Sequence, residues 1–149
     1  MTMEQPNVQI GLRAVNETVF TYHSEMISND FDPKNIRLGF KNRIAALDIE
    51  KNFISVEFGV KYSYGTNDLL ESVCKFDFNV LNLKNFVITN PDKSVKINVI
   101  MPFLLSTALG TLRGVLLART GGTRLHDFPL PIINVEQLIK GLAQTAPKA

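Results

Sequence analysis

Strict alternation of apolar and polar residues over two long runs is the feature that most restricts the fold. In residues 52–64 nearly every second side chain is apolar, and residues 70–80 repeat the pattern after the segment YGTNDL. A period of two is that of a half-buried β-strand, so we predict two strands joined as a hairpin with a loop longer than two residues. The apolar faces consist of Ile54, Val56, Phe58, Val60, Tyr62 and Tyr64 in the first run and Leu70, Cys74, Phe76, Phe78 and Val80 in the second.

Two earlier runs extend the same sheet. One strand begins at Val8 and is expected to reach about Tyr22, and another begins near Ile36 and continues into IAALDIE. A further short strand is favoured at VKINVI, residues 95–100. We therefore predict four long antiparallel strands in a meander, with one apolar face and one hydrated face.

The C-terminal third has helical spacing instead. Pro102 suits the first turn of a helix that the leucine spacing predicts for residues 102–119, before a Gly121-Gly122 cap. After a loop rich in Gly and Pro, Asn134 is a favourable N-cap for a second helix.

The fold class that these patterns predict is α+β, a four-stranded antiparallel sheet with two C-terminal helices packed on one face. We expect one domain, residues 1–143, followed by a disordered tail at residues 144–149. No internal repeat and no long linker divides the chain.

Composition and charge exclude several classes of function. The 149 residues carry a net charge of +2 without a Lys/Arg block, so charge does not indicate nucleic-acid binding. The single Cys74 cannot form an internal disulfide, and the first residues lack the regions of a signal peptide, so we expect a cytoplasmic protein. His23 and His126 lack metal-ligand spacing, and no serine lies in a nucleophile-elbow pattern. We therefore expect no enzyme, no metal and no cofactor.

The helix at 102–119 is apolar on nearly all sides, which indicates burial on more than one side. A second subunit would supply that burial, and the spacing of Gly110 and Gly114 would let two helix backbones approach closely. A membrane span is the alternative, but the uninterrupted apolar run is shorter than the ~18 residues that a span needs. We predict no membrane insertion and an oligomer interface at Leu105, Leu109, Gly110, Leu112, Gly114 and Leu116.

The segment FPLPIINVEQLIKGL, residues 128–142, has two interpretations. Its apolar side chains either fill the core under a long loop or line a surface that binds another apolar chain. The loop at 23–34 poses the same choice, because it carries Met26, Ile27 and Phe31 among polar residues.

The order of these elements resembles SecB, the bacterial protein-export chaperone. The stretch PIINVEQL, residues 131–138, resembles a family segment ending in Pro-Ile-Asn-Phe-Asp-Ala-Leu, with one residue more between the proline and the asparagine. The resemblance covers most of the chain in pattern and about residues 100–140 in motif. It implies a dimer or dimer of dimers that holds unfolded or pre-secretory polypeptides in long apolar grooves without ATP.

The resemblance also implies where clients bind. The groove that it suggests runs between the loop at 23–34 and the C-terminal segment, with Met26, Ile27, Phe31, Phe128, Leu130, Ile133, Leu138 and Leu142 as client-binding residues. Typical SecB proteins are acidic and dock the SecA motor through acidic side chains on the sheet. Here the charged side chains on the sheet have both signs, so SecA binding stays open. They are Glu57, Lys61, Glu71, Lys75 and Asp77. Two alternatives also stay open: a dedicated chaperone of a toxin–antitoxin system, and a small hydrophobic-ligand-binding protein.

Overall fold

The computed structural model describes residues 8–23, 25, 27, 32–97, 99–128, 130, 131 and 133–142. For residues 33, 124 and 140–142 the backbone alone is described. The predicted tail at 144–149 lies outside these residues, as do Met26 and Phe31.

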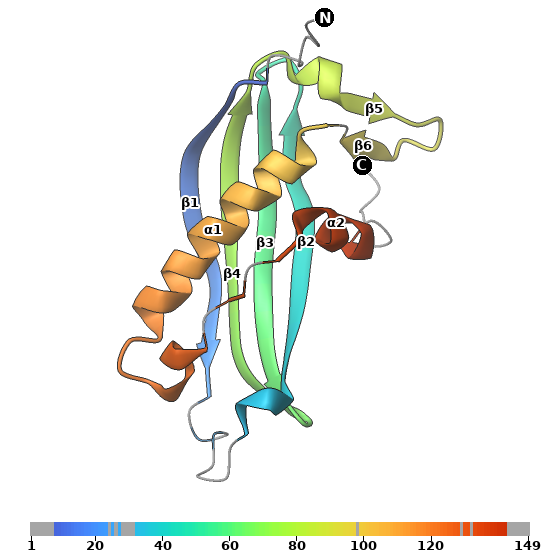
Figure 1. Cartoon of the computed structure of the whole chain (residues 1–149). Helices are drawn as coiled ribbons and strands as arrows, with labels where there is room; N and C mark the ends of the chain where they lie inside the picture. The colour runs from blue at the N-terminus through green and yellow to red at the C-terminus, as the bar shows by residue number, and fades with distance from the viewer. Residues whose placement is uncertain are drawn as a thin grey trace, which may run out of the picture.

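Four long strands form one antiparallel sheet (Figure 1). They are β1 (Ile10–Tyr22), β2 (Ile36–Asp48), β3 (Phe53–Tyr64) and β4 (Asn67–Val80), in the order β1-β4-β3-β2. The four-stranded antiparallel sheet is confirmed. The strands β2, β3 and β4 follow one another as a meander, and β1 crosses over to pair with β4.

The hairpin between β3 and β4 is tighter than the sequence suggests. Only Gly65 and Thr66 lie between the two strands, because Asn67 and Asp68 already belong to β4. Gly65 has a φ of 62°, a left-handed conformation that glycine adopts without steric cost. The predicted longer loop is therefore corrected to a two-residue turn.

Short elements connect the sheet to the helices. The single turn η2 (Pro33–Asn35) precedes β2, and η3 (Leu83–Phe86) leads to a small hairpin of β5 (Val87–Thr89) and β6 (Val95–Ile97). The predicted strand at 95–100 is thus found at its first three residues, while its partner β5 was not predicted. A further turn, η4 (Arg124–Asp127), follows the first helix.

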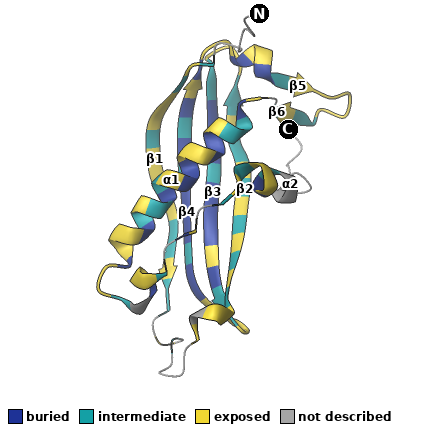
Figure 2. Cartoon of the chain, viewed as in Figure 1, coloured by how far each residue is buried: buried dark blue, intermediate teal, exposed yellow. Residues whose placement is uncertain are grey.

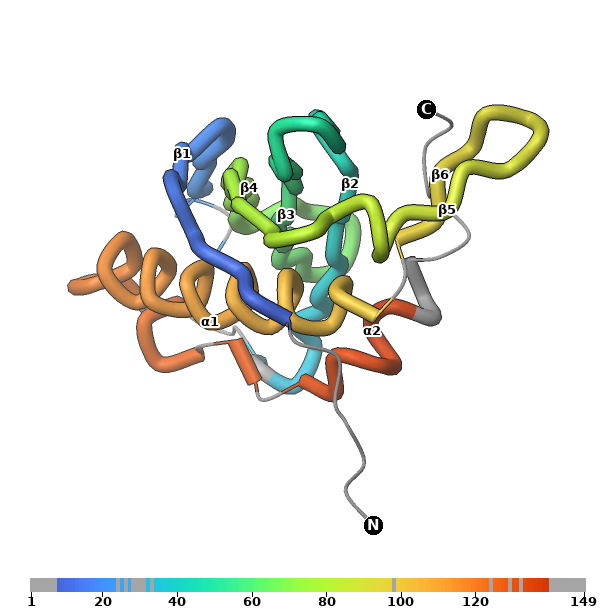
Figure 3. Tube along the Cα trace, turned by 90° about the horizontal axis from the view of Figure 1, so that it is seen from above, coloured from blue at the N-terminus to red at the C-terminus, as the bar shows by residue number. Residues whose placement is uncertain are grey.

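Both helices, α1 (Met101–Arg119) and α2 (Val135–Leu142), lie on the same side of the sheet (Figure 3). Asn134 caps α2, since its Oδ1 accepts hydrogen bonds from the backbone N–H of Glu136 at 2.9 Å and of Gln137 at 3.4 Å. The α+β class with two C-terminal helices on one face is therefore confirmed.

The core lies between α1 and the central strands β3 and β4. The helix-facing side chains of these strands are at most 3% exposed: Ile54, Val56, Phe58, Val60, Tyr62, Leu70, Cys74, Phe76, Phe78 and Val80. From α1 they meet Leu104, Leu105, Ala108, Leu109, Leu112 and Leu116. By length and composition α1 could cross a membrane, but its leucine stripe packs on the sheet, as in the core helix of a soluble domain.

Candidate functional site

The helix-facing apolar side chains of β2 are less covered than those of β3 and β4. Ile36, Leu38, Phe40 and Ile44 are half-buried, whereas the β3 residues opposite the last three are at most 3% exposed. The cause is the path of α1, which packs across β4 and β3, while α2 lies over β2 (Figures 1 and 2). We call the set Ile36, Leu38, Phe40, Ile44, Phe128 and Ile133 the β2 margin.

Three hydrogen bonds fasten the chain segment beside this margin. Arg113 on α1 donates from Nε to the carbonyl of Leu130 at 3.0 Å and from Nη2 to that of Pro131 at 2.9 Å. Tyr62 on β3 donates its hydroxyl to the carbonyl of Phe128 at 3.2 Å. Burial raises the pKa of Tyr62 to about 12, although the Arg113 charge lowers it, so the phenol stays a donor at neutral pH.

The segment at 128–142 divides between the two interpretations. Leu130 and Leu138 are 3% and 9% exposed and belong to the core. Phe128 and Ile133 are half-buried and pack against the core from its edge. Ile27, in the loop at 23–34, does the same. The other predicted client-binding residues, Met26 and Phe31, and the side chain of Leu142 lie outside the description. Leu130 and Leu138 were predicted to bind clients. Their burial corrects this prediction, because they are core residues.

A second apolar surface lies at the opposite edge of the sheet. We call it the β1 margin, and it consists of Leu12 and Val15 on β1 and Phe103 on α1, which are 42%, 38% and 53% exposed. Phe103, Thr107, Gly110, Gly114 and Leu117 recur at helical spacing and form one exposed face of α1. A hollow of about 450 Å³ extends this surface and is lined by Val8, Ile10, Leu12, Phe78, Phe103, Ser106 and Thr107.

The predicted interface on α1 divides into two parts. Leu105, Leu109, Leu112 and Leu116 are at most 4% exposed and fill the chain's own core, so they are not available to a second subunit. Gly110 and Gly114 are exposed, and a Cβ atom on either would meet no atom within 4 Å. The structure thus corrects the prediction for the four leucines and leaves the two glycines on a free helix face.

A polar clamp joins the C-terminal end of α1 to β1. Arg119 forms an ion pair with Glu17, with Nε donating to Oε2 at 3.2 Å, and its guanidinium lies 4.5 Å from the ring centre of Phe20. A guanidinium over an aromatic face adds attraction to the ion pair. This clamp joins the last turn of α1 to β1.

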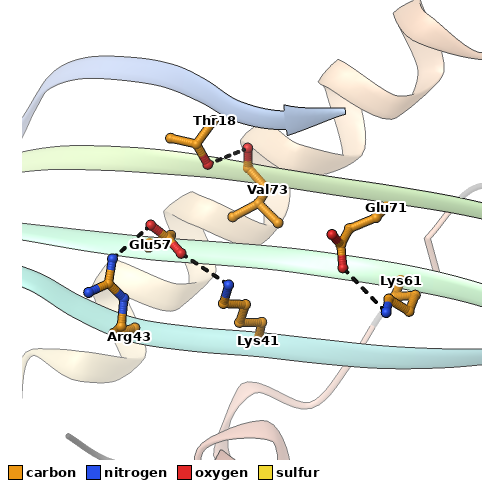
Figure 4. Close-up of polar contacts among 7 residues, drawn as sticks. All are labelled: Thr18, Lys41, Arg43, Glu57, Lys61, Glu71 and Val73. Atoms are coloured by element: carbon orange, nitrogen blue, oxygen red, sulfur yellow. Dashed lines mark hydrogen bonds and ion pairs between the residues drawn. The ribbon is translucent and has the colours of Figure 1, made fainter. Parts of the chain in front are cut away.

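The sheet face turned away from the helices is charged. Glu57 accepts a hydrogen bond from Arg43 at 3.0 Å and lies 3.3 Å from Lys41 (Figure 4). Burial alone would raise the pKa of Glu57, but Arg43 and Lys41 together lower it. The predicted mixed charges lie here in cross-strand register, Glu57 opposite Lys75 and Lys61 opposite Glu71, while Asp77 accepts a hydrogen bond from Ser55 at 2.7 Å.

Groups for catalysis or metal binding do not converge in the described part of the chain. Its residues contain no group of three or more His, Cys, Asp and Glu side chains that could hold a metal ion. Cys74 is buried, and burial raises the pKa of its thiol, which makes it a poor nucleophile. The cavity under α1, lined by Tyr62, Leu70, Leu116, Leu117, Thr120, Leu125 and Phe128, has a volume of about 10 Å³. That is about the room of one water molecule and too little for a hydrophobic ligand.

Comparison with known proteins adds little to this geometry. No protein-family model matches the chain, and no curated protein matches it. A solved structure, the crystal structure of a protein of unknown function from Streptococcus agalactiae, aligns over 85% of this chain and 98% of its own. The two are 12% identical, with a TM-score of 0.37.

Sequence reasoning missed the residues that fasten these surfaces. Arg113 is an isolated charge in an otherwise apolar helix, and that was the available signal, because a cation on a packed helix needs acceptors. Glu17 and Arg119 are 102 residues apart, and no local pattern links them. Phe103 could have been found from its spacing with Gly110 and Gly114, which places all three on one helix face.

Proposed function

We propose that this protein is an ATP-independent holdase chaperone of the SecB type that binds unfolded polypeptides in the cytoplasm. The observation that supports it best is the β2 margin, a set of half-buried apolar side chains on the edge strand β2 and in the segment beside it. An extended, apolar polypeptide would complete the burial of these side chains. The proposal needs no cofactor and no nucleotide.

The β1 margin fits a different role, the contact with a second copy of the chain. Its side chains are more exposed than those of the β2 margin, and the ion pair of Glu17 and Arg119 joins α1 to β1 at this edge. Gly110 and Gly114 leave open space above α1, which suits close packing of two helices. We therefore propose a homo-oligomer built on the β1 margin, with the client surface on the other edge.

Binding to SecA is not part of the proposal. The outer face of the sheet carries Lys41, Arg43, Lys61 and Lys75 beside its carboxylates, and electrostatic complementarity selects against a partner that requires an acidic surface.

The test is suppression of aggregation of an unfolded protein, followed by light scattering without ATP. The wild-type chain should suppress scattering at near-equimolar ratios. The pair Ile36→Thr and Ile44→Thr should weaken suppression, because both changes keep a β-branched side chain and remove apolar area from the β2 margin.

Val19→Thr is the matched control, since Val19 is also half-buried but lies on the opposite face of the sheet. It should suppress scattering as the wild type does. No suppression by the wild-type chain at any ratio would overturn the proposed function.

A further inference from the structure

The two edges of the sheet differ in how well they could accept another strand. β2 keeps a continuous antiparallel register with β3 from Ile36 to Ile44, nine residues, before a register shift at Ile44/Ala46. β1 is broken twice, between Leu12 and Ala14 and between Glu17 and Val19. Bulges blunt an edge against pairing, and a regular edge presents its free N–H and C=O groups as a template.

Among the described residues, no backbone group pairs with the outward N–H and C=O groups of this run. The sheet ends at β2, whose one strand partner is β3, and the described backbone hydrogen bonds outside the sheet do not involve residues 36–48. The bulge after Ile44 sets a natural end to any added strand.

The outer face of the run is basic. Arg37, Lys41 and Arg43 lie on it at alternate positions, with Gly39 between the first two. Lys41 and Arg43 share the one carboxylate of Glu57, and Arg37 forms no ion pair with any described residue. Three cations therefore stand against one adjacent anion, and the side chains of Lys41 and Arg43 are 58% and 51% exposed.

The inner face of the same run is apolar except at Asn42, whose buried Oδ1 has no hydrogen-bond partner among the described residues, and Gly39 leaves space on the outer face. Ile36, Leu38, Phe40 and Ile44 are the half-buried side chains of the β2 margin. A Cβ atom on Gly39 would meet no atom within 4 Å, so the outer face of β2 is open at this position. One strand edge thus combines basic and apolar faces at a spacing of two residues.

We propose that Ile36–Ile44 binds an extended polypeptide as a fifth strand, selecting segments that alternate apolar and acidic residues. The proposal rests on the proposed function in naming the client segment, but its site can be tested separately. Backbone hydrogen bonds supply the mode of binding, the β2 margin receives the apolar side chains, and Arg37, Lys41 and Arg43 receive the carboxylates. A nucleic acid could meet the cations but would leave the apolar face unused.

The experiment uses the full chain and three fluorescent peptides as long as the Ile36–Ile44 run, alternating valine with glutamate, glutamine or lysine. Anisotropy should rank glutamate first and lysine last, with the difference shrinking as salt rises. Arg37→Glu should weaken binding of the glutamate peptide about fivefold, and Lys96→Glu, the same charge change on β6, should leave it unchanged.

Two further glutamate peptides test the strand itself. In a bound strand, the N–H groups of alternate residues point toward β2 and toward solvent in turn. One peptide carries backbone N-methyl groups on the first alternating set of residues, and the other peptide carries them on the second set. Strand addition predicts that one peptide binds at least about tenfold more weakly than the other. Equal binding of both would overturn strand addition.

The outcomes separate this inference from the proposed function. Suppression of aggregation without a glutamate preference would overturn the inference and keep the holdase. Glutamate-selective binding without any suppression would keep the edge site and overturn the holdase. Absence of peptide binding, together with self-association of Arg37→Glu, would assign the basic residues to protection of the edge and overturn the inference.

Discussion

The two edges of one sheet differ in what covers them. At the β1 edge, Arg119 at the end of α1 forms an ion pair with Glu17 on β1, and Phe103 on α1 is well exposed. At the β2 edge, the cover is the segment beside β2 and the short helix α2, and the apolar side chains Ile36, Leu38, Phe40 and Ile44 are half-buried.

The difference follows from how each cover is built. A helix of 19 residues spans the sheet diagonally and buries its own stripe, so any apolar residue on its far side has no partner within the chain. The described residues of the segment at 128–134 belong to no helix or strand, and Arg113 and Tyr62 donate hydrogen bonds to the carbonyls of Leu130, Pro131 and Phe128. The β1 edge is therefore the more exposed of the two, and the cover of the β2 edge is held by a few hydrogen bonds.

The largest expected effect tests whether the C-terminal segment belongs to the core. Leu130→Ala should lower the free energy of unfolding by about 2–5 kcal/mol, because Leu130 is buried and its removal leaves a cavity. Leu12→Ala, the same change on the β1 margin, should cost no more than about 0.5 kcal/mol. Urea denaturation measures both, and similar losses in the two variants would erase the distinction between the edges.

The next effect concerns the fastening itself. Arg113→Met keeps an apolar stem but removes both donors, so the carbonyls of Leu130 and Pro131 lose their partners. We expect a loss of about 1.5–3 kcal/mol, the range for hydrogen bonds to a charged group. Arg113→Lys should recover only part of it, because an ammonium group lacks the forked geometry. Wild-type stability in Arg113→Met would show that packing alone holds the segment.

The strands and helices could be predicted because their signals are local. Alternation located β3 and β4, and leucine spacing with Pro102 located α1. The position of β1 beside β4 could not be read in this way, since strand order depends on which edge is left free after the β2–β3–β4 meander forms. The turn at Gly65 was misjudged because Asn67 and Asp68 are typical loop residues that here pair within a strand.

The candidate site was less predictable than the fold. Apolar residues at 128–142 carry the same sequence signal whether they are buried, as Leu130 is, or half-buried, as Phe128 and Ile133 are. The α1 leucines were assigned to an interface because a helix apolar on all sides has no preferred face in the sequence. Packing against the sheet chose that face and left Phe103, Gly110 and Gly114 on the other.

A third effect tests the β1 margin as a contact between copies. Gly114→Leu adds a side chain into open space on the single chain, so folding should be unaffected. In an oligomer with closely packed helices, the same side chain would overpack the contact at a cost of about 1–3 kcal/mol and shift the mass toward the monomer. Gly114→Ala should shift it less. Sedimentation velocity measures the mass, and an unchanged distribution in both variants would separate the β1 margin from assembly.

The smallest effect is the loss of stability at low pH, which tests the charged outer face of β2 separately from its inner face. The ordinary pKa of a glutamate is 4.5, and the value for Glu57 is lower in the folded chain, because Arg43 and Lys41 outweigh the effect of burial. A carboxylate with a lowered folded pKa stabilises fully above its unfolded pKa, and that contribution is lost as the pH falls through the folded value. We expect the urea midpoint to fall between about pH 5 and pH 3, and Glu57→Gln to show a shallower fall with its midpoint at neutral pH slightly reduced. If the urea midpoints of the wild type and Glu57→Gln fell equally with pH, Lys41 and Arg43 would be hydrated rather than paired with Glu57. All three cations of the β2 edge would then be free to bind an acidic strand.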